Sequence, residues 1–177
     1  MSDTAYEERI VRTMEAFRRN RYDVSRFAER TAAADYLAAE IRGKRVGFGD
    51  SETLRALSLY ERLSEHNEVI DPPRAGHVGG IEAFLAAGRE ALMTDIFVLS
   101  ANAVTEQGQI LNMDGAGNRV AGSLFGHEKT YFVVGINKLV PDIEAGIARI
   151  HEIAAPRNAH RKGKKTPCAK DGTRCYD

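Results

Sequence analysis

Residues 96–119 of this 177-residue chain read IFVLSANAVTEQGQILNMDGAGNR. The segment opens with the continuous apolar run 96–99, which is typical of a parallel strand covered on both faces. The turn-forming residues 105–108 lead into a second apolar pair, Ile110 and Leu111, and predict a hairpin. Residues 114–119 then place polar side chains and two glycines shortly after that pair. Open α/β sheets bind their ligands at strand ends of this kind.

The rest of the chain alternates short apolar runs with amphipathic stretches. Strands are expected at 46–49, 68–70, 96–99 and 130–134. Helices are expected over 5–20, over 31–41, from Ser51 through Leu63, over 81–92 and after Pro141, and a loop over 74–80. This alternation predicts an α/β fold with a mostly parallel sheet.

The expected core faces and boundaries follow from the same periodicity. Buried stripes are expected in two helices, one with Ile81, Phe84, Leu85 and Leu92, the other with Ile143, Ile147 and Ile150. We expect residues 1–155 to form a single α/β domain, which begins with the helix over 5–20. Residues 156–177 are expected to be a basic, cysteine-containing tail.

Composition narrows the class of protein. A hydrophobic content of 43% in 177 residues is enough for one sizeable core. Lys plus Arg and Asp plus Glu each number 25, so no global basic field favours nucleic acid. No apolar run approaches the roughly 20 residues that span a bilayer. The polar N-terminus lacks an apolar signal core, so no membrane partner and a cytoplasmic location are expected.

The cysteines are confined to the end of the chain, at Cys168 and Cys175. Two cysteines supply only half of a four-ligand zinc or iron–sulfur site, so they would bind metal only with further ligands. Reduced thiols in the tail are the simpler expectation.

Three polar segments follow apolar runs. The first is Gly49-Asp50-Ser51, the second carries Asn102 and Glu106, and the third runs from Asp114 to Arg119. If the strands are parallel, all three lie at one edge of the sheet. The sequence therefore predicts one ligand site there.

The residue types in these segments suggest roles. Gly115 and Gly117 let backbone approach a ligand, and a helix that opens near Asn118 favours an anion. Arg119 can grip a phosphate or carboxylate, and Glu106 is the candidate general base or nucleophile. The same residues are also ordinary turn formers. They are not a dinucleotide fingerprint, because Val120 occupies the third glycine position.

Five ordered blocks in the second half of the chain carry a family resemblance. They are SANAVTEQG (100–108), NMDGAGNRVA (112–121), VVGINK (133–138), APRNAHR (155–161) and KTPCA (165–169). On these blocks the chain resembles the bacterial LUD-domain (lactate-utilisation) proteins, especially short stand-alone members. The resemblance implies a three-layer α/β sandwich of the sugar-phosphate isomerase and CoA-transferase type. It also implies a working carboxylate after a central strand, the place that Glu106 holds.

Two departures from the family pattern bear on the site. Family members often have Gly-Gly-Ser where this chain has Gly49-Asp50-Ser51. The extra carboxylate weakens a phosphate site or invites a metal. Relatives of this type usually continue beyond Cys175 with further cysteines, so a metal cluster built from the tail is expected to be incomplete in this chain.

The leading expectation is a LUD-type protein that binds a small anionic metabolite or a nucleotide-like ligand and supports L-lactate oxidation to pyruvate with iron–sulfur partner proteins. Two alternatives remain open: a free-standing isomerase or acyl/CoA-transferase-like enzyme that uses Glu106, and a non-catalytic scaffold subunit of a redox complex. The sequence indicates no particular cofactor, and a homo-oligomer is compatible with it.

Overall fold

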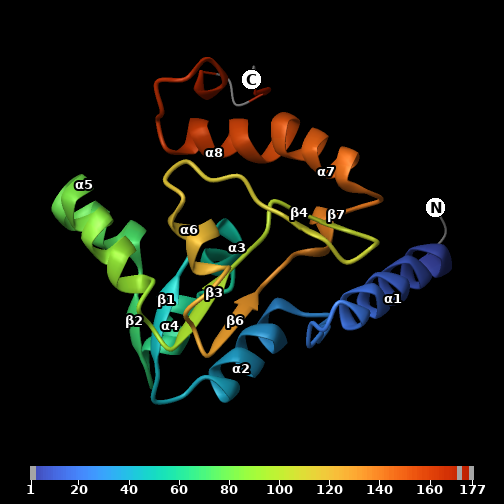
Figure 1. Ribbon diagram of the computed structural model, residues 1–177, viewed down its shortest axis with the longest axis horizontal. Coiled ribbons are helices and arrows are strands. Elements are labelled where there is room, and N and C mark those ends of the chain that lie inside the picture. Colours follow the sequence, from blue (N-terminus) through green and yellow to red (C-terminus); the bar gives the residue numbers. More distant parts are fainter. Residues whose placement is uncertain (1–2, 171–172, 176–177) are drawn as a thin grey trace. The chain divides into compact units, whose positions relative to one another are not determined.

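A computed structural model describes residues 3–170 and 173–175 (Figure 1). The chain forms two compact units. Unit 1 comprises Met1–Ser25, Ala101–Met113 and Gly135–Asp177, and unit 2 comprises Arg26–Ser100 and Asp114–Val134. The chain therefore passes between the units four times, after Ser25, Ser100, Met113 and Val134.

Unit 2 is built on a parallel sheet. Its strands, in the order β2-β1-β3-β6, are Glu68–Ile70, Arg45–Phe48, Ile96–Leu99 and Lys129–Phe132. Val46 pairs with Val69 on one side and with Ile96 on the other, and Val98 pairs with Tyr131. All three neighbouring pairs run parallel, which confirms the predicted α/β fold with a mostly parallel sheet. All carboxyl ends therefore lie along one edge.

Helices cover both faces of this sheet, giving three layers. Because strand side chains alternate, Val46 and Val98 face the layer of α2 (Arg30–Glu40), α3 (Glu52–Ala56) and α4 (Leu59–Ser64). Phe97 and Leu99 face the opposite layer of α5 (Pro72–Ala91) and α6 (Asn118–Gly122). Gly122 lies so close to Phe97 that an added Cβ would be 2.5 Å from its ring.

Two predicted segments differ from the structure. The single helix expected from Ser51 to Leu63 is two short helices, because Ser58 adopts a left-handed conformation with φ of 50°. The loop expected over 74–80 is helical, because Asp71 caps α5 and Pro72 occupies its first turn. Gly80, with φ of 72° and ψ of −157°, then interrupts that helix.

The expected buried stripes are wrong in part. Ile81 and Leu85 are 68% and 42% exposed, and Ile143 and Ile147 are 45% and 48% exposed. In α5 the buried residues are instead the small Gly88 and Ala91, together with Pro72 at the start of the helix. In α7 (Ile143–Arg149) Gly146 is buried, and Ile150 is buried at the start of the π-helix that follows. Small residues allow a helix to pack closely, and a pattern of large apolar residues does not reveal them.

Unit 1 combines a small sheet with helices. The predicted hairpin is present as antiparallel β4 (Ala103–Thr105) and β5 (Ile110–Leu111), and β7 (Leu139–Val140) lies parallel to β4. The helices are α1 (Asp3–Arg19), α7 (Ile143–Arg149) and α8 (Ala155–Arg161), with a π-helix, η2 (Ile150–Ala154), between the last two. Two short 3₁₀ helices are η1 (Ile136–Lys138) and η3 (Pro167–Ala169).

Candidate functional site

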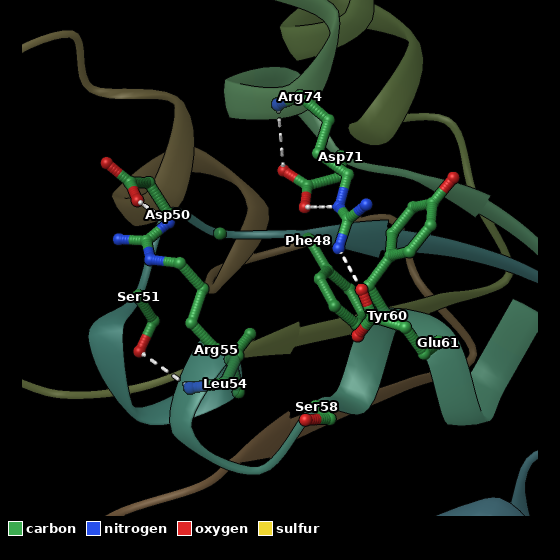
Figure 2. A pocket seen from close by; sticks show the side chains of 11 residues that line it. Phe48, Asp50, Ser51, Leu54, Arg55, Ser58, Tyr60, Glu61, Asp71 and Arg74 are labelled. Carbon is green, nitrogen blue, oxygen red and sulfur yellow. Dashed lines mark hydrogen bonds and ion pairs between the residues drawn. The ribbon is translucent and has the colours of Figure 1, made fainter. Parts of the chain in front are cut away.

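A cavity of about 170 Å³ lies at the carboxyl ends of β1 and β2 in unit 2 (Figure 2). β1 ends at Phe48 and continues into Gly49, Asp50 and Ser51, and β2 continues directly into Asp71. Since β1 and β2 are parallel neighbours, both continuations reach the same edge of the sheet. The structure thus places the first of the three predicted polar segments in the wall of a cavity.

Two helix caps fix the edge of this cavity. Ser51 Oγ accepts hydrogen bonds from the backbone N–H groups of Thr53, at 3.1 Å, and Leu54, at 3.4 Å. Asp71 Oδ1 accepts one from the N–H of Arg74 at 3.5 Å. Serine and aspartate are preferred caps because their side chains satisfy N–H groups that the first helical turn leaves open.

Each of two aspartates in the cavity pairs with an arginine from the helix that follows it. Asp50 Oδ1 lies 2.8 Å from Arg55 Nη1, and Asp71 Oδ2 lies 3.5 Å from Arg74 Nε. Arg74 also pairs with Glu61, and its guanidinium lies 3.7 Å above the centre of the Tyr60 ring. In Figure 2 the Asp50–Arg55 pair lies to the left of the Phe48 ring and the Asp71–Arg74 pair lies above it.

The aspartates and arginines differ in how far they are withdrawn from solvent. The side chains of Asp50 and Asp71 are each 12% exposed, whereas those of Arg55 and Arg74 are 41% and 51% exposed. Burial raises the pKa of Asp71; Arg74 and Arg55 oppose the shift, and Asp50 adds to it. Burial disfavours the charge of Arg55, but Glu52 and Asp50 outweigh it and raise its pKa.

The third predicted segment is organised around its own ion pair. Asp114 Oδ1 accepts from Nε and Nη2 of Arg119, both at 2.7 Å, and Asp114 Oδ2 accepts from the backbone N–H of Val120 at 2.9 Å. Arg119 Nη1 donates to the carbonyl of Ser100 at 3.2 Å. Both side chains are only 10% exposed. The predicted anion grip, Arg119, therefore has its guanidinium engaged with groups of the protein.

Glycines around Arg119 have different surroundings. A Cβ added at Gly49 would lie 2.8 Å from Arg119 Cγ, so only glycine leaves room for that side chain. Gly115 and Gly117 have open space around them, and Gly117 adopts φ of 83° immediately before α6. Asn118 lies beside Gly88 of α5. Within unit 2 the structure thus joins Gly49 to the Asp114–Arg119 pair.

Asn102 and Glu106 belong to unit 1. Asn102 Oδ1 accepts from the N–H of Met113 at 2.8 Å, which ties the start of β4 to the end of the hairpin. Glu106 follows β4 and forms an ion pair with Arg9 of α1, with 2.6 Å between Oε1 and Nε. These side chains are 25% and 20% exposed. Glu106 therefore has a fixed cationic partner, which leaves its catalytic role a prediction.

The cysteines lie in unit 1 as thiols. Cys168 is buried in η3, with its Sγ 3.3 Å from Oγ1 of Thr166, and Cys175 is half-buried. In the part of the chain that the structure describes, no group of three or more His, Cys, Asp or Glu side chains could hold a metal ion.

The sequence interpretation missed four charged residues of the cavity and one ion-pair partner. The cavity residues are Arg55, Glu61, Asp71 and Arg74, and the partner is Arg9 of Glu106. A signal for Asp71 was present, since an aspartate between a strand and a proline is a helix-start pattern.

Fold and cavity together define an α/β protein with a small charged cavity at the carboxyl edge of a parallel sheet. The LUD domain model matches residues 10–174, and the chain belongs to this lactate-utilisation family. The sequence matches no curated protein and no solved structure at a significant level. Across residues 3–170 and 173–175, no helix combines the length and apolar character needed to cross a membrane.

Proposed function

We propose that the protein binds a small anionic hydroxy acid in the cavity at the carboxyl ends of β1 and β2, and in this way supports L-lactate oxidation together with iron–sulfur partner proteins. Membership of the lactate-utilisation family supports the link to this substrate. The observation that carries the proposal is the pair of Asp–Arg couples within one cavity.

The chemistry of a hydroxy acid matches these couples. Such an acid carries a carboxylate beside a hydroxyl, and an arginine fork binds the carboxylate in a bidentate way. Arginine has no acceptor, so the hydroxyl proton needs a carboxylate such as Asp50 or Asp71. The two arginines are the solvent-accessible partners of each couple and therefore meet an entering anion first.

Charge and size argue against larger or more highly charged ligands. Each arginine already pairs with two carboxylates, Asp50 and Glu52 for Arg55 and Asp71 and Glu61 for Arg74, so a phosphate dianion gains less from this cavity than a monoanion with a hydroxyl. The volume of about 170 Å³ is below the roughly 300–1,000 Å³ of pockets for drug-sized ligands. A small metabolite fits that volume better than a nucleotide.

Calorimetric titration with L-lactate tests the cavity, with propionate as a ligand that keeps the carboxylate but lacks the hydroxyl. Arg55→Gln and Arg74→Gln should each weaken L-lactate binding by about tenfold or more, the loss of one charge-assisted contact. Arg45→Gln is the matched control. Arg45 lies at the opposite end of β1 and pairs with Glu68 and Glu90.

The proposal fails if L-lactate does not bind, or if Arg45→Gln weakens binding as much as Arg55→Gln. If propionate binds as tightly as L-lactate, the hydroxyl group contributes nothing to binding, and the proposed role of Asp50 or Asp71 as its acceptor is wrong. The second arm measures lactate-dependent dye reduction by the protein combined with its iron–sulfur partners, where Arg55→Gln should lower the rate and Arg45→Gln should not.

The alternative of an acyl-transferase-like enzyme rests on Glu106, whose carboxylate Arg9 holds in place. Intact-mass measurement after incubation with acyl-CoA compounds would detect an adduct, and Glu106→Gln should abolish it. A scaffold subunit, in contrast, predicts assembly with a redox partner and no ligand in the cavity.

A further inference from the structure

A continuous helical segment near the end of unit 1 contains a wide turn. α7 (Ile143–Arg149) runs into the π-helix η2 (Ile150–Ala154), which runs into α8 (Ala155–Arg161), as the orange-to-red helix of Figure 1 shows. The residues at the junctions keep right-handed helical angles. A π turn holds one residue more than a regular turn, and such turns occur frequently at functional sites.

The wide turn brings two arginines onto one face of the helix. Arg149 and Arg157 are eight residues apart, which in a regular helix would separate them by roughly 80° around the axis. Because the π turn absorbs one residue, they behave like positions seven apart and lie within roughly 20° of each other. They are two turns apart along the helix, within reach of a shared ligand for side chains as long as arginine.

Arg149 is anchored rather than paired. Its Nε donates to the carbonyl of Asn137 at 3.4 Å, and its Nη1 donates to the carbonyl of Asn102. Neither contact neutralises its charge, and the rest of its N–H donors make no further hydrogen bond to described residues. The guanidinium is therefore held in place, and some of its donors are left unused by the described residues.

No carboxylate compensates these two charges within the described residues. Arg157 is exposed and has no hydrogen bond or ion pair there, and Arg149 has only the two carbonyl contacts. Burial lowers the pKa of Arg149, and the neighbouring charge of Arg157 lowers it further. Two like charges in one place are unfavourable unless an anion joins them.

We propose that Arg149 and Arg157 form a second anion site, for a phosphate group, on the helical segment from α7 to α8. A single arginine fork satisfies the two oxygens of a carboxylate, whereas a phosphate offers enough oxygens for two forks at once. This site is in unit 1 and does not depend on the cavity of unit 2. Variants at Arg55 or Arg74 leave it unchanged.

The test is calorimetric titration of the full chain with inorganic phosphate at constant ionic strength, with chloride as the balancing salt. Arg157→Gln should weaken phosphate binding by about tenfold or more. Arg161→Gln is the matched control, because Arg161 lies one turn further on α8 and bonds to Asn158 Oδ1 at 2.8 Å. It removes the same charge and should change binding by less than about twofold.

A second measurement separates loss of the site from loss of the fold. In chloride, Arg157→Gln should melt at the same temperature as the parent protein or higher, because a like-charge repulsion is removed. Phosphate should raise the melting temperature of the parent but not of Arg157→Gln. Arg157→Lys keeps the charge but loses the fork, and should bind phosphate more weakly than the parent.

Three results would overturn the proposal. The first is no phosphate binding beyond that of chloride. The second is an equal loss in Arg157→Gln and Arg161→Gln, which would show a diffuse basic surface. The third is succinate binding as tightly as phosphate, which would assign the two arginines to a dicarboxylate.

Discussion

The buried Asp114–Arg119 ion pair is expected to contribute strongly to the free energy of unfolding, which affects how variants at the candidate site are interpreted. Asp114→Asn removes the negative charge beside a guanidinium that is only 10% exposed. Breaking a buried pair by removing one partner costs about 3–5 kcal/mol, because the remaining charge stays desolvated. The amide retains one acceptor oxygen, so we expect the lower end, about 3 kcal/mol. This includes the hydrogen bond from the Val120 N–H.

Urea unfolding followed by far-ultraviolet circular dichroism measures this loss, since the chain contains no tryptophan. With a slope of about 1–3 kcal/mol per molar urea, a loss of 3 kcal/mol lowers the midpoint by about 1–3 M. Asp35→Asn is the control: it removes the partner of Arg62 from an exposed pair, where the loss should be at most about 1 kcal/mol.

A double variant completes the test. Arg119→Met in the Asp114→Asn background removes the stranded charge, so it should recover at least half of the lost free energy. The reasoning is refuted if Asp114→Asn costs no more than Asp35→Asn, or if adding Arg119→Met lowers stability further. If both expectations hold, Arg119 mainly stabilises the fold. A loss of ligand binding in an Arg119 variant is then explained by a weakened fold and not by a lost contact to the ligand.

Three further predictions test other features of the two units. Gly49→Ala should cost about 1–3 kcal/mol in urea unfolding, because its Cβ would lie 2.8 Å from Arg119 Cγ. The pKa of Asp71 is raised by burial, so its protonated form favours folding and this contribution is lost as pH rises through the folded-state pKa. Asp71→Asn keeps the cap, so its stability relative to the parent should increase from pH 4 to pH 7; a decrease contradicts this. A double-mutant cycle of Arg9→Gln and Glu106→Gln should give a coupling of about 1 kcal/mol, and zero coupling would discount the pair.

The strands and the fold class could be predicted from the sequence because short apolar runs such as 96–99 admit few alternatives. The helix boundaries were harder to predict from the sequence. Ser58 takes a left-handed conformation that its side chain does not demand, so packing of Leu59 and Leu63 against the core decides where α3 ends and α4 begins. Tertiary packing often overrides local preference in this way.

The residues of the candidate site also fall into those that the sequence could predict and those that it could not. Asp50 and Ser51 could be found because they follow directly after a strand. Arg74 could not, because its position depends on the helical conformation of a segment that reads as a loop. The roles of Asp114 and Arg119 depend on their burial as an ion pair. A segment of polar residues and glycines does not show in its sequence that two of its charged side chains pair with each other.

The four passages of the chain between its two units have a consequence for how the protein folds. Val104 of β4 pairs with Leu139 of β7, a separation of 35 residues, and the sheet of unit 2 is complete only when β6 has been added. Neither unit can therefore close until most of the chain has left the ribosome. Non-local pairings of this kind slow folding, because the chain loses the entropy of a long loop before the stabilising contacts form. No single cut at a boundary separates the two units from each other, so they are expected to fold, and to be inherited, together.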